Sequence, residues 1–137
     1  MSHLNYYASN NITFMAAQGL LNFGIEIAIK QKIVVSIAVV DRAGQLVAFG
    51  KMDAAPPISA SVAEGKARTA AAIQDSTELF ESMINRGEVA MLSVPHLVPL
   101  KGGLPLCAGG EIIGAVGVSG STGEGDLSLA KCIVAAL

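Results

Sequence analysis

Hydrophobic residues follow two spacings along this chain, and the order of the two spacings predicts its elements. Residues 33–40 are almost continuously apolar and β-branched, which predicts a strand covered on both faces. Before them, residues 11–29 carry apolar side chains at steps of three and four, as on one face of a helix. Asn10 or Asn11 is expected to cap this helix, since a short polar side chain accepts from its free N–H groups.

A hairpin is expected next. Asp41 to Gly44 fits a tight turn, because Asp suits its first position and Gly tolerates the left-handed conformation that closes it. Residues 45–50 return as the second strand, and residues 51–57 form a loop that ends in two prolines.

Two helices should follow this loop. The first begins at Ser59 or Ser61, has unusually small side chains, and carries a capping-box pattern from Ser61 to Glu64. Asp75 and Glu78 form a second capping pattern. A break is therefore expected near residue 74, with a third helix that stops at residue 87.

The carboxy-terminal third predicts a second hairpin, of residues 104–107 and 111–118, and a last helix over 126–137. Residues 88–101 are read as a long loop, part of which is expected to pair if the sheet has five strands. The predicted fold is α+β: an antiparallel sheet of four or five strands with helices packed on it. Residues 1–137 form one domain, with residues 1–9 loosely ordered.

Composition narrows the classes of function. Hydrophobic residues make up 52% of the chain and charged residues 15%, yet no apolar run is long enough to span a membrane. Apolar surface hidden between subunits explains this balance, so a homo-oligomer is expected. With a net charge of −2 and no basic block, nucleic acid is not an expected partner.

The first residues show no secretory signal, so a cytoplasmic protein is expected. Cys107 and Cys132 are not in a Cys-x-x-Cys arrangement, and we interpret both as reduced and buried. Their spacing leaves a disulfide between them open.

Several strings resemble the GlcG/HbpS family over roughly residues 9–137, with the motifs in the same order. They are residues 39–49, 52–55, 66–71, 102–106 and 113–120. The resemblance implies a profilin-like sandwich, frequent oligomers, and a role in binding haem or related tetrapyrroles. In one place the chain departs from the family, which usually has Gln-Asp before the last helix, whereas this chain has Gly125-Asp126. The family's amide is lost, and Asp126 is expected to cap the helix.

The glycine-rich loop before the last helix is the first candidate site. Such a turn can present N–H groups to an anion, and it also carries hydroxyls. Its spacing matches neither the P-loop nor the dinucleotide fingerprint, and the carboxylates of Glu124 and Asp126 would repel an anion. Two readings stay open: a structural turn, or a loop that lines a site for a carboxylate or propionate held by a nearby cation. The candidate residues are Ser119, Gly120, Ser121, Thr122 and Gly123.

His96 lies between two prolines, close in sequence to Lys101, Gly102 and Gly103. A neutral imidazole suits haem iron as an axial ligand, although a lone histidine in a loop is more often simply solvated. Two distant histidines and two separated cysteines do not indicate a zinc cluster.

Met52, Asp53 and Lys66 complete the candidate residues. Met52 and Asp53 follow a strand end, where binding loops often form, and Met52 can pack on a macrocycle or serve as a soft iron ligand. The alternative is an ordinary loop. Lys66 and Arg68 can hold propionates, although such a pair of cations more often lies on a solvated face.

Catalysis finds little support in the sequence. It has no Gly-x-Ser-x-Gly elbow, and a single usable histidine lacks an orienting partner. We therefore favour a small-ligand binding protein, for haem or a related tetrapyrrole, over an assembly module without a ligand. An enzyme acting on a small carbonyl or hydroxy compound ranks last, because only the metabolic neighbours of the family suggest it.

Overall fold

The computed structural model describes residues 4–137. Its elements follow the predicted order, with one additional 3₁₀ helix. They are α1 (Phe14–Gln31), β1 (Ser36–Asp41), β2 (Leu46–Lys51), α2 (Ser59–Ile73), α3 (Thr77–Asn85), η1 (Val89–Ser93), β3 (Gly103–Ala108), β4 (Glu111–Ser119) and α4 (Gly123–Ala135).

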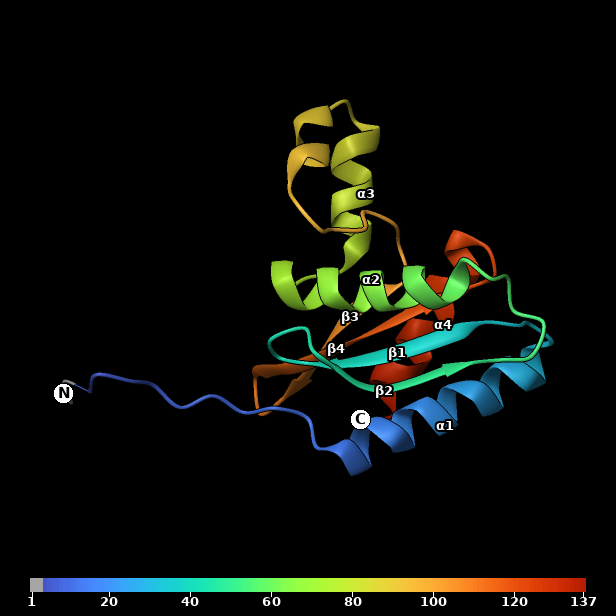
Figure 1. Cartoon of the computed structure of the whole chain (residues 1–137), viewed down its shortest axis with the longest axis horizontal. Helices are drawn as coiled ribbons and strands as arrows, with labels where there is room; N and C mark the ends of the chain where they lie inside the picture. Colours follow the sequence, from blue (N-terminus) through green and yellow to red (C-terminus); the bar gives the residue numbers. More distant parts are fainter. Residues whose placement is uncertain (1–3) are drawn as a thin grey trace.

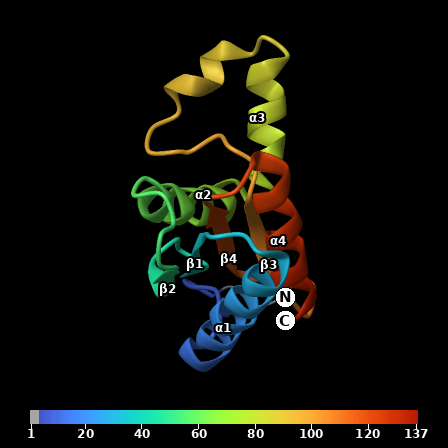
Figure 2. The same ribbon diagram turned by 90° about the vertical axis from the view of Figure 1, so that its right-hand side faces the viewer.

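The four strands form one antiparallel sheet in the order β2-β1-β4-β3. Helix α2 covers one face of the sheet, and α1 and α4 cover the other (Figures 1 and 2). This arrangement confirms the predicted α+β fold. Of the two predicted strand numbers, four is found: residues 88–100 form no fifth strand and contain η1 instead.

Strand β1 lies at the centre of the sheet and is buried on both faces, as its apolar run predicts. Ile37 and Val39 belong to the large core cluster shared with α1 and α4, whereas Ala38 and Val40 face the small residues of α2. Gly117 in β4 lets α2 approach very closely. A Cβ there would overlap the carbonyl oxygen of Ala63 and lie 2.6 Å from the amide nitrogen of Ala67.

The predicted cap of α1 is wrong. Thr13 caps α1, and its hydroxyl accepts from the N–H of Ala16. Asn10 and Asn11 instead tie the incoming chain to the sheet, since the Asn10 side chain donates to Glu111 and Asn11 Oδ1 accepts from the N–H of Arg42.

The capping box of α2 is not formed. Ile58 occupies the N-cap position without a side-chain bond, and Ser61 Oγ donates to the Ile58 carbonyl. Ser59, one of the two predicted starts, is the first residue of α2 and is fully buried.

The later helices begin at other caps than the sequence pattern indicates. Gln74 adopts a left-handed conformation and separates α2 from α3, as predicted, but Ser76 rather than Asp75 caps α3. Thr122 caps α4, which therefore begins three residues before Asp126. Asp126 is thus not the cap of the last helix.

Helix α3 and η1 form an arm that projects from the rest of the molecule (Figure 2). Phe80 is buried at its base, whereas Leu79, Val89 and Leu92 are exposed. Among the described residues, no helix is long and apolar enough to cross a membrane. Both cysteines are free, but Cys107 is exposed and Cys132 is half-buried, which corrects the prediction that both are buried.

Candidate functional site

Two loops that are far apart in sequence meet in one hollow. The loop after β2 contributes Ala54 and Pro56, and the glycine-rich loop after β4 contributes Gly120 and Ser121. The segment that joins α1 to β1 lines the third side. The hollow has a volume of about 350 Å³, and its remaining lining residues are Ile33 and Val34.

The register of the sheet explains this meeting. Ser36, the first residue of β1, pairs with Lys51 at the end of β2 and with Ser119 at the end of β4. Both loops therefore leave the sheet at the same edge, one on each side of the first residue of β1. The Ser36 hydroxyl also bonds to the hydroxyl of Ser59 at 2.8 Å, which fixes the start of α2 there.

The glycine-rich loop lies tightly against the chain that enters β1. Gly120 has a φ of 133°, and a Cβ there would lie 2.7 Å from the Val34 carbonyl oxygen. Thr122 then turns the chain into α4 and accepts from the N–H of Gly125 at 3.0 Å. Only glycine fits the position of residue 120 without moving the backbone.

Lys66 and Asp126 form a buried ion pair behind this loop. The Lys66 ammonium lies 3.1 Å from Asp126 Oδ2 and donates to the Val118 carbonyl at 2.9 Å. The side chains are only 4% and 5% exposed. The other carboxylate oxygen of Asp126 accepts from the N–H of Ser121 at 2.9 Å. Because it is buried, Lys66 lies neither on a solvated face nor in the lining of the hollow. Its ammonium is already paired with Asp126.

Lys101, beside Gly123 at the start of α4, is surrounded by three carboxylates. Its ammonium lies 2.6 Å from Glu124, 3.4 Å from Glu81 and 4.0 Å from Glu78. The hydrogen bond to Glu124 raises the pKa of Lys101 above its ordinary value of 10.5. The same bond lowers the pKa of Glu124 below 4.5. Lys101 is thus paired, like Lys66, rather than free for a ligand.

The adjacent glycines serve packing. Gly102, at a φ of 124°, leaves room for the Lys66 ammonium, which would lie 2.9 Å from a Cβ at that position. Gly103 packs against the backbone of Lys66 and the side chain of Thr77. Its N–H donates to the Thr77 hydroxyl at 2.9 Å. Both predicted residues lie behind the glycine-rich loop and do not line the hollow.

A second hollow, of about 360 Å³, lies on the α1 side of the same hairpin exit. Its lining includes Lys51, Met52 and Asp53, with Ile25 and Ile29 from α1. Met52 is partly buried, and its sulfur accepts from the N–H of Val35 at 3.5 Å. The thioether sulfur therefore already has a partner in the chain that enters β1.

His96 does not join either hollow. It is exposed, with a φ of 62°, and its carbonyl accepts from Arg68 at 3.4 Å. Arg68 lies beside Gly44 in the turn of the first hairpin. This turn lies at the opposite end of β1 from the hollows, about 20 Å away for six extended residues.

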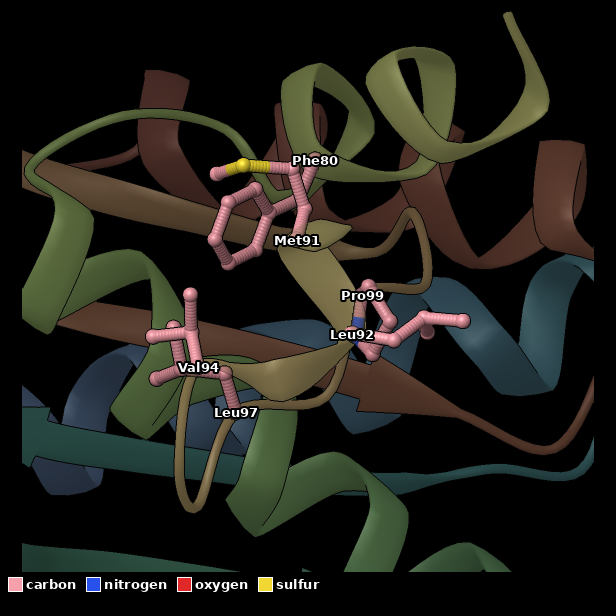
Figure 3. A pocket seen from close by; sticks show the side chains of 6 residues that line it. All are labelled: Phe80, Met91, Leu92, Val94, Leu97 and Pro99. Carbon is pink, nitrogen blue, oxygen red and sulfur yellow. The ribbon is translucent and has the colours of Figure 1, made fainter. Parts of the chain in front are cut away.

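The loop that carries His96 has a small apolar core of its own. It contains a cavity of about 30 Å³, and Figure 3 shows the side chains that line this cavity. They are Phe80, Met91, Leu92, Val94, Leu97 and Pro99. A cavity of this size holds about one water molecule, so it does not admit a larger ligand.

Sequence reasoning missed Ile33, which lines the hollow, along with two further lining residues and one buried pairing. Val34 and Pro56 line the hollow, and Asp126 is the buried partner of Lys66. The sequence contained one signal for Asp126: an acidic residue among the apolar residues of the last helix needs a partner if it is buried. Among the described residues, no group of three His, Cys, Asp or Glu side chains is placed so that it could hold a metal ion.

Comparison with known proteins identifies the family of this chain. Residues 12–135 match the family model described as haem degrading protein HbpS-like. The chain belongs to this family. It is 45% identical to protein GlcG of Escherichia coli strain K12 over 103 residues, which is 75% of this chain and 77% of GlcG.

Two solved structures have the same fold. The ORFY protein of Klebsiella pneumoniae superposes with a TM-score of 0.92 at 29% identity, covering 98% of this chain and 96% of that one. The PduOC haem complex superposes with a TM-score of 0.83 at 26% identity, covering 93% and 95% of the two chains.

The glycine that departs from the family pattern has a local role here. A Cβ at Gly125 would lie 2.6 Å from Ser121 Oγ and 3.2 Å from Thr122 Oγ1. A glutamine at this position would therefore have to displace the Ser121 side chain from its place beside α4. The missing amide thus leaves room for the hydroxyls of the glycine-rich loop.

Proposed function

We propose that this protein binds haem or a related tetrapyrrole, in a homo-oligomer, at the hollows beside the first hairpin's exit. The observation that carries the proposal is the superposition on the PduOC haem complex, with a TM-score of 0.83 over 93% of this chain. Membership of the HbpS-like family supports the same ligand class.

The residues at the hollows fit such a ligand. A tetrapyrrole has broad apolar faces, and sites for flat cofactors are mostly apolar with few polar groups. Ile33, Val34 and Pro56 line one hollow, and Ile25 and Ile29 line the other. The loop of residues 52–54 separates them, so one macrocycle can contact both sides of this loop.

The proposed assembly would complete the site. Both hollows are open on a single chain, and a second copy placed over them would exclude water from the ligand. His96, the predicted axial ligand, lies at the other end of the hairpin, so it would reach the iron from a neighbouring copy. Cys107 and Cys132 are free, which suits the reducing conditions of the cytoplasm.

Titration with haemin tests the proposal. A saturable, shifted Soret band at micromolar haemin, with about one equivalent per chain, is the expected result. A band that grows linearly with added haemin, without saturation, would remove the proposal.

A second candidate function, an assembly or partner-interaction module without a ligand, is favoured by the projecting arm. Leu79 is 45% exposed, Val89 64% and Leu92 61%, and exposed apolar side chains gathered on one arm are typical of a contact surface. Analytical ultracentrifugation tests this function. A monomer at every concentration would contradict it, whereas an oligomer that does not saturate with haemin would favour it over ligand binding.

A further inference from the structure

We propose that the hollow between the two loops takes an uncharged, apolar edge of the ligand and that the ligand's carboxylates remain outside it. The proposal rests on the proposed function and deepens it. It reverses the expectation that the glycine-rich loop holds a carboxylate or propionate.

The lining of the hollow is the first argument. It consists of Ile33, Val34, Ala54 and Pro56, with the two residues Gly120 and Ser121 at the loop. None of these six side chains is charged. A carboxylate that entered would meet no cation in this lining, and burial of its charge would be costly once a second copy covered the hollow.

The commitment of the nearest buried cation is the second argument. Lys66 donates to Asp126 at 3.1 Å and to the Val118 carbonyl at 2.9 Å. Because the opposite charge lies in direct contact, the pair presents almost no net charge to the loop in front of it. The hollow therefore lacks the positive field that an anion site needs.

The backbone donors of the loop are the third argument. A glycine-rich turn before a helix binds anions through its free N–H groups. Here the Ser121 N–H donates to Asp126 Oδ1 at 2.9 Å, and the Gly125 N–H donates to Thr122 Oγ1 at 3.0 Å. The protein's own side chains thus occupy two of the donors that a ligand carboxylate would use.

The neighbouring hollow offers an outlet for the carboxylates. Lys51 lies at its lining and is exposed, and no salt bridge joins Lys51 to another described residue. A ligand with its apolar edge beside Val34 can therefore leave its carboxylates near Lys51 or in water.

The test adds a positive charge to the hollow and compares the binding of haemin with that of its uncharged ester. In Val34→Lys, a cation enters the lining of the hollow, and haemin binding is expected to weaken by about tenfold or more. Met15→Lys on α1 is the matched control, since Met15 is 77% exposed and lines neither hollow. Haemin dimethyl ester, which lacks the charged propionates, should bind wild type within about threefold of haemin. Tighter haemin binding by Val34→Lys, or loss of ester binding by about tenfold, would overturn the proposal.

A second measurement does not depend on haem. The amide resonances of Gly120 and Ser121 are followed by NMR during addition of methyl propionate and, separately, sodium propionate. Saturable shifts with the uncharged ester alone are expected, whereas saturable shifts with the anion alone would overturn the proposal. If wild type fails to bind haemin but its amides respond to the ester, the proposed function falls and the preference for an uncharged group stands.

Discussion

The ammonium of Lys66 and the carboxylate of Asp126 lie 3.1 Å apart although 60 residues separate them in the chain. This contact joins the centre of α2 to the first turn of α4. Through its second oxygen, Asp126 also holds the N–H of Ser121 at 2.9 Å. The pair therefore links the sheet-covering helix to the loop that lines the proposed site.

Breaking this pair should cost much stability. Lys66→Met leaves the Asp126 charge buried without its partner, and Asp126→Asn leaves the Lys66 charge in the same state. We expect each to lower the free energy of unfolding by about 3–5 kcal/mol, measured by urea denaturation. Lys66→Met combined with Asp126→Leu removes both charges and should recover more than half of that loss.

The exposed pair of Arg86 and Glu88 is the matched control. Its atoms lie 3.0 Å apart, but the side chains are 63% and 51% exposed. Replacing either with Ala should change the unfolding free energy by less than about 1 kcal/mol. Equal effects at the two pairs would show that burial does not govern the contribution of Lys66.

Gly117→Ala should be strongly destabilising. The added Cβ would overlap the Ala63 carbonyl oxygen, and backbone atoms cannot rotate away as a side chain can. We expect a loss of about 3 kcal/mol or more in chemical denaturation. Gly19→Ala is the matched control, because nothing lies within 4 Å of its Cβ and it is exposed within α1. That variant should gain about 0.5–1 kcal/mol from reduced backbone entropy in the unfolded chain, and a loss would contradict this account.

The Lys101 cluster should make stability depend on pH. The folded pKa of Glu124 lies below 4.5, so the unfolded chain binds its proton first and this contribution is lost as pH falls below about 4.5. The folded pKa of Lys101 lies above 10.5, so its contribution is present at neutral pH and is lost as pH rises through that higher value.

Lys101→Met should therefore differ most from wild type near pH 7, and the two stabilities should converge as the solution is made acidic. Urea midpoints between pH 3 and pH 8 measure this difference, which added salt should also reduce. Lys30→Met, at the exposed end of α1, is the comparison variant and should show no such convergence. A pH-independent difference for Lys101→Met would speak against pairing with Glu124.

His96→Ala should change the Soret maximum of the haemin complex if this histidine reaches the iron from a neighbouring copy. Met52→Leu should leave the maximum in place, because the Met52 sulfur already accepts from the N–H of Val35. Absorbance spectra of both variants at saturating haemin provide the measurement. The reverse pattern, with Met52→Leu shifting the band and His96→Ala inert, would assign the ligand to methionine.

The sequence by itself determined the elements of this protein, because hydrophobic spacing is a local property. The apolar run before Asp41 predicted a strand buried on both faces, and β1 is that strand. The turn ending at Gly44 was also predictable, since the Gly44 N–H bonds to the Asp41 carbonyl and its φ is 82°. The helix caps were less predictable, because several short polar residues compete at each helix start and tertiary contacts select one of them.

Only the tertiary structure decided which charges are available. The sequence suggested that Lys66 could hold a ligand carboxylate and that Asp126 caps a helix. It could not show that these two side chains lie in contact, because that depends on how α2 and α4 pack. Strand register brings the loop with Ala54 beside the loop with Ser121. His96 instead contacts Arg68, which lies beside the turn at the other end of the hairpin. Burial then commits Lys66 to Asp126, since a charge removed from water needs an opposite charge in contact.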